Sequence, residues 1–144
     1  MSRIAPALLS PDAYSFAIEV ATRFADLDPN GHINNVAMAA AFEDARFRFV
    51  LSLGGPQAAG GARMVIASVY VDYLAEAMYP LPLTMRVGVS RVGRTSWTMH
   101  QLAEQQGQVK AYCSSTLVAT SEGRPTPLSE AWRTKLQEHI RVTE

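Results

Sequence analysis

A short polar stretch near the start of the chain holds the densest group of residues able to do chemistry. Residues 26–35 read D-L-D-P-N-G-H-I-N-N, and the proline and glycine within them are typical of a turn. Capping a helix needs only one or two polar side chains, so six of them favour a functional loop over a plain turn. The six side chains are those of Asp26, Asp28, Asn30, His32, Asn34 and Asn35.

The chain after this loop predicts a long, largely buried helix over about residues 34–53. It is apolar and rich in helix-forming residues until G-G-P at 54–56 stops it. The first turn of a helix has backbone N–H groups without intrahelical partners and carries partial positive charge. A thioester or ester carbonyl placed there would be polarised, as in an oxyanion hole. Asp28 could then activate water or attack the carbonyl, while His32 could orient the substrate or shuttle a proton.

The string D-L-D-P-N-G-H-I-N-N, followed by F-E-D-A-R, resembles the signature of hotdog-fold acyl thioesterases of the hydroxybenzoyl-CoA thioesterase branch. Plant-type acyl-ACP thioesterases are similar over the same stretch. The resemblance implies that Asp28 is the nucleophile or general base and that the Asn35 amide polarises the thioester carbonyl. The acyl-ACP branch further implies catalytic roles for Asn30 and His32. We take the neighbouring Asn34 as a candidate substrate-binding residue.

Two positions of the predicted helix bear on the same site. The glutamate of the family's helix motif falls on Glu43, which follows Asn35 by eight residues and so shares its helix face. A carboxylate on an apolar helix needs a partner, and Glu43 either pairs with Arg46 or faces the pocket. Met38 stands where the family usually has tyrosine, which leaves the shape of the acyl pocket open.

A second candidate site lies in the predicted hairpin V-G-R-T-S-W at residues 92–97. The guanidinium of Arg94 and the hydroxyls of Thr95 and Ser96 could bind a phosphate through charge-assisted hydrogen bonds. A simple glycine-arginine turn explains the same residues equally well. The resemblance favours the phosphate, because a similar hairpin lies near the CoA phosphates in that family.

The length and composition of the chain limit the classes of protein to which it can belong. The 144 residues predict a single domain spanning 1–144, with 18% charged residues and zero net charge. Nothing in this balance indicates nucleic acid or an anionic membrane as a partner, and no apolar run has transmembrane length. The N-terminal residues are too short and proline-broken for a signal peptide. A lone cysteine, Cys113, excludes an internal disulfide and fits a cytoplasmic location, and the three scattered histidines disfavour a metal site.

The remaining pattern predicts an antiparallel sheet. Alternating or β-prone segments predict strands at 14–24, 64–74, 83–92, 95–103 and 109–120, with a flexible connection at 54–61 and a short helix at 129–140. Short turns between the later strands favour antiparallel pairing, and the long helix must pack on one face. The expected class is therefore α+β, the hotdog fold of a long central helix packed on about five antiparallel strands.

We interpret the chain as a cytoplasmic acyl-CoA thioesterase that releases a free acid and CoA and needs no cofactor beyond the CoA of its substrate. Acyl-ACP is the second choice of carrier. A hotdog dehydratase or hydratase and a non-catalytic acyl-CoA-binding protein remain alternatives. An open sheet has edges that must be covered, which predicts a homodimer or homotetramer. The resemblance implies that two sheets pair edge to edge and that the active site forms between subunits.

Overall fold

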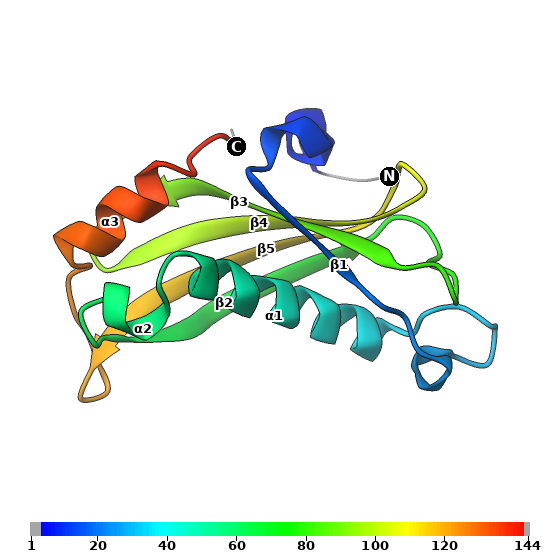
Figure 1. Ribbon diagram of the computed structural model, residues 1–144, viewed down its shortest axis with the longest axis horizontal. Coiled ribbons are helices and arrows are strands. Elements are labelled where there is room, and N and C mark those ends of the chain that lie inside the picture. Colours follow the sequence, from blue (N-terminus) through cyan, green and yellow to red (C-terminus); the bar gives the residue numbers. More distant parts are fainter. Residues whose placement is uncertain (1–3, 143–144) are drawn as a thin grey trace.

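A curled antiparallel sheet wraps around one long helix in the computed structural model, which describes residues 4–142 (Figure 1). The sheet order is β1-β3-β4-β5-β2, and a short β6 pairs with β5. The strands are β1 Phe16–Val20, β2 Arg63–Tyr73, β3 Leu83–Val92, β4 Ser96–Gln105, β5 Gln108–Ser121 and β6 Arg124–Pro125. The α-helices are α1 Asn35–Ser52, α2 Gly55–Ala58 and α3 Glu130–Gln137. This arrangement confirms the predicted α+β hotdog fold.

The helix α1 packs its small and aromatic side chains against the concave face of the sheet. Its buried residues recur every three or four positions, as expected for one helix face, and alanines allow close approach to the strands. They are Met38, Ala41, Phe42, Ala45 and Phe49. The opposite face is less covered than the sequence predicted, because Val36 and Phe47 are 72% and 61% exposed. None of the helices within the described residues is both long and apolar enough to cross a membrane.

Three segments differ from the sequence prediction. Residues 54–61 are not simply a flexible link, because Pro56 near the first position helps begin the one-turn helix α2. The first strand is shorter than expected, since the chain leaves the sheet after Val20 and forms a 3₁₀ turn at Phe24–Asp26. Beyond the predicted end of the sheet, β6 folds back on β5.

The strand β2 forms one edge of the sheet and, in the part of the chain that is described, pairs only with β5. A register shift between Ile66 and Ser68 makes Ala67 the extra residue, so the regular alternation expected along this strand is broken. Large apolar side chains on β2 remain 41–53% exposed: Val65, Ile66, Val69, Tyr70 and Tyr73. An exposed apolar edge strand of this length is a template for pairing with another strand.

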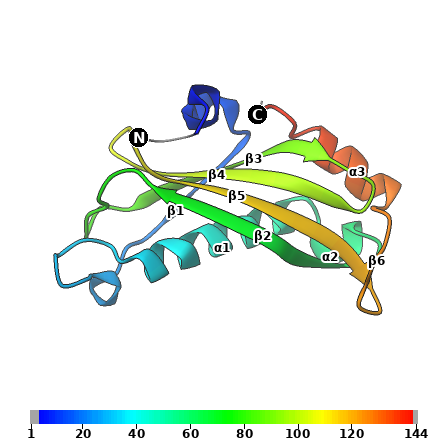
Figure 2. The same cartoon turned by 180° about the vertical axis from the view of Figure 1, so that it is seen from behind.

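Different segments of the chain gather at the two ends of the sheet. At one end the 3₁₀ turn, the loop before α1 and the β2–β3 connection lie together, linked by a hydrogen bond from Ile33 N to Ala77 O. At the other end the β3–β4 hairpin lies against α3, and the N–H of Leu128 donates to the carbonyl of Arg94 (Figures 1 and 2). The ten residues of β3 separate these ends by about 30 Å.

Candidate active site

The side chain of Asp28 is held by its own turn. Its Oδ1 accepts hydrogen bonds from the backbone N–H groups of Asn30 (2.9 Å) and His32 (3.1 Å). The backbone of Asp28 closes the same turn, donating to His32 O and accepting from the N–H of Gly31. Gly31 adopts φ +81°, a conformation that L side chains rarely tolerate, which explains the glycine. One carboxylate oxygen of Asp28 is thus held by the backbone of its own turn.

The neighbouring carboxylate, Asp26, is engaged differently. Arg23 donates to it from Nε and Nη2, at 3.2 and 2.8 Å from Oδ1, and from its backbone N–H to Oδ2. The side-chain hydrogen bonds from Arg23 hold the pKa of the Asp26 carboxyl below its usual range. The carbonyl of Asp26 also accepts from the N–H of Asn34. Asp26 therefore braces the loop and is a poorer base than a carboxylate without such a partner.

The first turn of α1 leaves two backbone donors facing outward. Asn34 is the N-cap: its Oδ1 accepts from the N–H of Ala37 at 2.7 Å, and its carbonyl accepts from Met38. The N–H groups of Asn35 and Val36 precede these in the turn and have no intrahelical acceptor. They are the donors that could polarise a carbonyl. The structure therefore gives Asn34 a capping role beside its predicted role in substrate binding.

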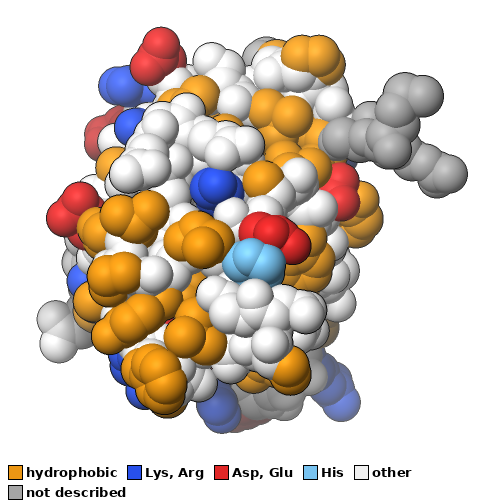
Figure 3. Space-filling view, turned by 90° about the vertical axis from the view of Figure 1, so that its right-hand side faces the viewer, with side chains coloured by type: hydrophobic (Ala, Val, Ile, Leu, Met, Phe, Trp, Pro, Cys, Tyr) orange, Lys and Arg blue, Asp and Glu red, His pale blue; other side chains and the backbone are white. Residues whose placement is uncertain are grey.

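His32 contacts a residue that the sequence did not single out. Its Nε2 lies 2.9 Å from Oε2 of Glu76, which belongs to the connection between β2 and β3. Figure 3 shows this end of the molecule, where a histidine and an acidic side chain lie together among hydrophobic ones. No local pattern around residue 76 indicates this contact, because it depends on the docking of two loops far apart in sequence.

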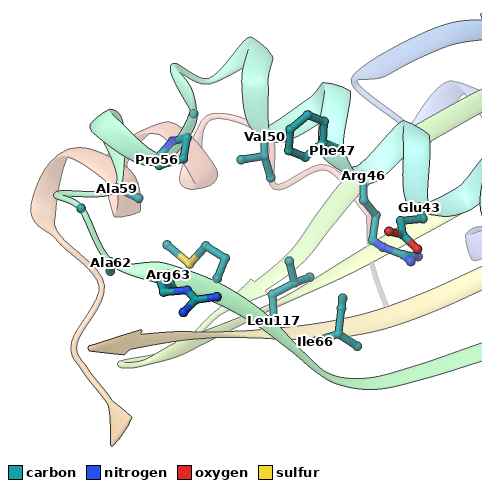
Figure 4. A pocket seen from close by; sticks show the side chains of 13 residues that line it. Glu43, Arg46, Phe47, Val50, Pro56, Ala59, Ala62, Arg63, Ile66 and Leu117 are labelled. Atoms are coloured by element: carbon teal, nitrogen blue, oxygen red, sulfur yellow. The ribbon is translucent and has the colours of Figure 1, made fainter. Parts of the chain in front are cut away.

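An apolar groove begins beside the helix N-terminus and follows the gap between α1 and the edge strand β2. Its first part, about 390 Å³, is lined by Val36, Ala39, Val69 and Val71 among others. Its second part, about 490 Å³, continues toward α2 between Phe47 and Val50 on one side and Met64 and Leu117 on the other (Figure 4). Asp28 lines neither part, so its turn lies beyond the groove, on the side of the helix N-terminus.

The middle of the groove is polar, because Glu43 and Arg46 line both parts. The two side chains lie near each other (Figure 4), but within the described residues no salt bridge joins them, so the predicted structural ion pair is wrong. Arg46 instead donates from Nη1 to Gln101 Oε1 (3.1 Å) and to the sulfur of Cys113 (3.6 Å). The predicted pair of Asp44 with Arg48, at 3.0 Å, is confirmed.

The hairpin predicted to bind phosphate lies far from Asp28 in the same chain. Arg94 is exposed, and its carbonyl accepts from Leu128 and from the guanidinium of Arg133. Thr95 and Ser96 follow in the same turn, which is closed by the N–H of Gly93 donating to Ser96 O at 2.7 Å. The structure therefore brings Asp28, Asn30, His32, Asn34 and Asn35 together and leaves Arg94 at the opposite end of the sheet.

Several other large or reactive side chains of the helix and the sheet belong to the buried core. Met38, Trp97 and Phe42 are at most 3% exposed, and of these only Phe42 reaches the groove. Burial raises the pKa of the Cys113 thiol to about 11, which makes it a poor nucleophile. Within residues 4–142, no three histidine, cysteine, aspartate or glutamate side chains gather in a way that could hold a metal ion.

A helix lying across a curled antiparallel sheet, with an acidic turn at its N-terminus, is the arrangement of a family of thioester-cleaving enzymes. The family model of the thioesterase-like superfamily matches residues 22–136, and the chain belongs to this superfamily. The matched segment includes the loop, α1 and all the strands after it.

Several solved structures share the fold over nearly their whole length. The chain is similar to a thioesterase from Thermus thermophilus that was solved in complex with coenzyme A and zinc. The two are 31% identical, and the match covers 90% of this chain and 97% of the Thermus chain with a TM-score of 0.79. A predicted thioesterase from Bacillus stearothermophilus is 34% identical, and the match covers 87% of this chain and 96% of that chain with a TM-score of 0.79.

A relative is also found by sequence. The uncharacterized protein YsmA of Bacillus subtilis is 35% identical over 92 residues, which span 64% of this chain and 63% of that protein.

Proposed function

We propose that this protein hydrolyses the thioester bond of an acyl-CoA. The observation that carries the proposal is the Asp28 carboxylate, fixed through Oδ1 by two backbone N–H groups and placed in the turn that leads into the N-terminus of α1. Membership of the superfamily and the thioesterases among the structural neighbours support a thioester hydrolase in general. The coenzyme A bound to the Thermus protein supports CoA as the carrier.

In the proposed reaction the thioester carbonyl lies against the N–H groups of Asn35 and Val36. Asp28 removes a proton from water, the water oxygen bonds to the carbonyl carbon, and the negative charge that develops on the carbonyl oxygen is stabilised by the helix N-terminus. When the intermediate collapses, the C–S bond breaks and the thiolate takes the proton from Asp28. Direct attack by Asp28 on the carbonyl, followed by hydrolysis of the anhydride, is the alternative route. Water and the substrate are the only reactants.

The apolar groove is the proposed site of the acyl group. Val36 joins the two parts of the site, because its N–H belongs to the helix N-terminus and its side chain lines the groove. From Val36 to Val50 the helix rises about 21 Å, so the groove extends well beyond the reacting carbonyl. Glu43 and Arg46 divide it about halfway, and we propose that Glu43 faces the substrate there.

We further propose that two chains pair through β2. Its free edge and exposed apolar residues support this, as does the family resemblance. A two-fold axis at that edge would pair the β2 strands antiparallel and bring the hairpin end of one chain beside the loop end of the other. Arg94 of the partner subunit would then lie on the same side as Asp28, which reconciles the distance within one chain with a role in binding CoA phosphate.

Thiol release from a panel of short, long and aromatic acyl-CoAs tests the proposed function. Hydrolysis of at least one acyl-CoA, with a higher kcat/KM than for the matching acyl-ACP, is the expected result. A higher kcat/KM for acyl-ACP would identify the acyl carrier protein, and not CoA, as the carrier. Tight acyl-CoA binding without thiol release would contradict hydrolysis and favour a binding protein. Loss or gain of a double bond in the acyl chain with the thioester intact would indicate a hydratase or dehydratase.

A further inference from the structure

The contact between His32 and Glu76 joins two loops that are far apart in the sequence. The side chain of Glu76 is 72% exposed and that of His32 is 23% exposed, so the pair contributes little to stability. Its two partners nevertheless come from different loops and meet at 2.9 Å. A contact that adds little stability, located beside the proposed reacting groups, needs another explanation.

The backbone on both sides fixes this geometry in advance. Residues next to the two partners are hydrogen-bonded to each other, because the N–H of Ile33 donates to the carbonyl of Ala77 at 2.9 Å. His32 also opposes Met78 in an antiparallel bridge. The pairing of these main chains brings the imidazole and the carboxylate near each other.

A buried glutamine anchors the loop that carries Glu76. Gln105, at the end of β4, is 3% exposed. Its amide accepts from the N–H of Met78 at 2.8 Å and donates to the carbonyls of Met78 (2.8 Å) and Leu81 (3.0 Å). These three hydrogen bonds tie residues 78–81 to the sheet. The connection that carries Glu76 is thus anchored to the sheet from Met78 onward.

We propose that Glu76 is a positioning residue that holds His32 in its Nε2–H tautomer and leaves Nδ1 as a hydrogen-bond acceptor for the attacking water. An ionised carboxylate only accepts hydrogen bonds, so Nε2 must donate to it, and the other nitrogen of a neutral imidazole then carries the lone pair. This inference rests on the proposed thioester hydrolysis. Asp28 takes one proton of the water, while Nδ1 of His32 accepts a hydrogen bond from the other and aims the oxygen at the carbonyl.

The proposal predicts a specific pattern among substitutions. Glu76→Ala removes the acceptor, so His32 samples both tautomers and kcat falls roughly tenfold while KM stays near that of wild type. Glu76→Gln keeps a side-chain oxygen that can accept from Nε2, and kcat should return to within about threefold of wild type. Glu19→Ala, which removes an exposed carboxylate from β1, is the matched control and should behave as wild type.

The deciding experiment joins kinetics with ¹⁵N NMR of the imidazoles, with the His32 signals assigned by their loss in His32→Ala. Wild type and Glu76→Gln should show the Nε2–H tautomer, and Glu76→Ala a mixture. In the His32→Ala background, adding Glu76→Ala should change kcat less than twofold, because the two residues act as one unit. Thermal unfolding checks that all variants are folded.

Two results would overturn the role of Glu76. One is an unchanged tautomer and kcat in Glu76→Ala, and the other is a loss of kcat that simply adds to that of His32→Ala. Both require that the wild-type protein turns over acyl-CoA. A wild-type protein that releases thiol from none of the substrates would overturn the proposed function itself, and the kinetic role of Glu76 with it.

Discussion

Replacing Asp28 with asparagine separates the charge of this side chain from its place in the turn. The Asn30 and His32 N–H groups donate to Oδ1, and the amide oxygen of asparagine can accept both hydrogen bonds. The turn should survive, with a loss of at most about 1 kcal/mol because the acceptor is no longer charged. The general base disappears, and we expect kcat to fall at least a hundredfold, within the range of about 10²–10⁴ for a positioned base.

Replacing Asp28 with alanine removes both the negative charge and the oxygen that accepts the hydrogen bonds of the turn. Two backbone N–H groups lose their acceptor, and at about 0.5–1.5 kcal/mol for each hydrogen bond the protein should lose roughly 1–3 kcal/mol of stability. For a chain of this size that corresponds to a fall in Tm of roughly 3–10 °C. The asparagine and alanine variants should therefore be similarly inactive but differ clearly in Tm.

The assay is thiol release at saturating acyl-CoA, followed with a chromogenic disulfide reagent. Asp26→Asn is the matched control, because it removes the neighbouring carboxylate, whose oxygens are already bound by Arg23. It should reduce kcat much less than Asp28→Asn. A kcat of Asp28→Asn within threefold of wild type would make Asp28 a turn residue only, and the reverse ranking would make Asp26 the base.

Four further predictions concern the dimer, the carrier, the shared site and the cysteine. Val69→Lys places a charge on the free edge of β2, and sedimentation should show a shift from dimer to monomer with a fall in activity; a fully active monomer would contradict a shared site. Arg94→Ala should raise the KM for acyl-CoA about tenfold with little change in kcat, and the turnover of a truncated pantetheine thioester should stay unchanged. An equal loss of kcat/KM on both substrates would assign Arg94 to the fold or the chemistry. Mixing Asp28→Asn chains with Arg94→Ala chains should raise kcat/KM above that of either variant, because one of the two sites in each mixed dimer has both residues intact. If kcat/KM does not rise after verified subunit exchange, each chain carries a complete site of its own. Cys113 should react slowly with iodoacetamide at pH 8 in the folded protein and fast after unfolding, because burial raises its pKa to about 11; fast reaction in the folded state would contradict this burial.

The sequence predicted those parts of the fold that depend on local patterns. The range expected for the long helix, 34–53, differs from the observed α1 Asn35–Ser52 by one residue at each end. The strand expected at 83–92 matches β3 because its alternation is regular and glycine and proline flank it. The clustering of Asp28, His32 and Asn35 was likewise predictable, because these residues lie within one loop and the start of one helix.

Contacts between distant segments could not be predicted in this way. Glu76 is 44 residues from His32, and nothing in its own surroundings indicates that it meets the loop of His32. The same holds for Gln105, which binds Met78 across 27 residues of sequence. An ion pair with Arg46 was one of the two alternatives that the sequence left open for Glu43, because the two are neighbours on the helix. In the folded chain Gln101 and Cys113 lie closer to the guanidinium of Arg46, so a tertiary contact replaced the local one.

The apolar surface left open in a single chain is concentrated where the proposed site needs a cover. Val36 on α1 and Val69 on β2 both line the groove, and both are large apolar residues more than 40% exposed. Their exposure is unfavourable in a monomer, since each Å² of apolar surface left in water forgoes about 25 cal/mol. Pairing at the β2 edge would remove part of this surface from water and bring the partner's hairpin toward the loop end. The same residues would then stabilise the proposed dimer and shape its acyl groove, so a substitution such as Val69→Lys should weaken association and activity together.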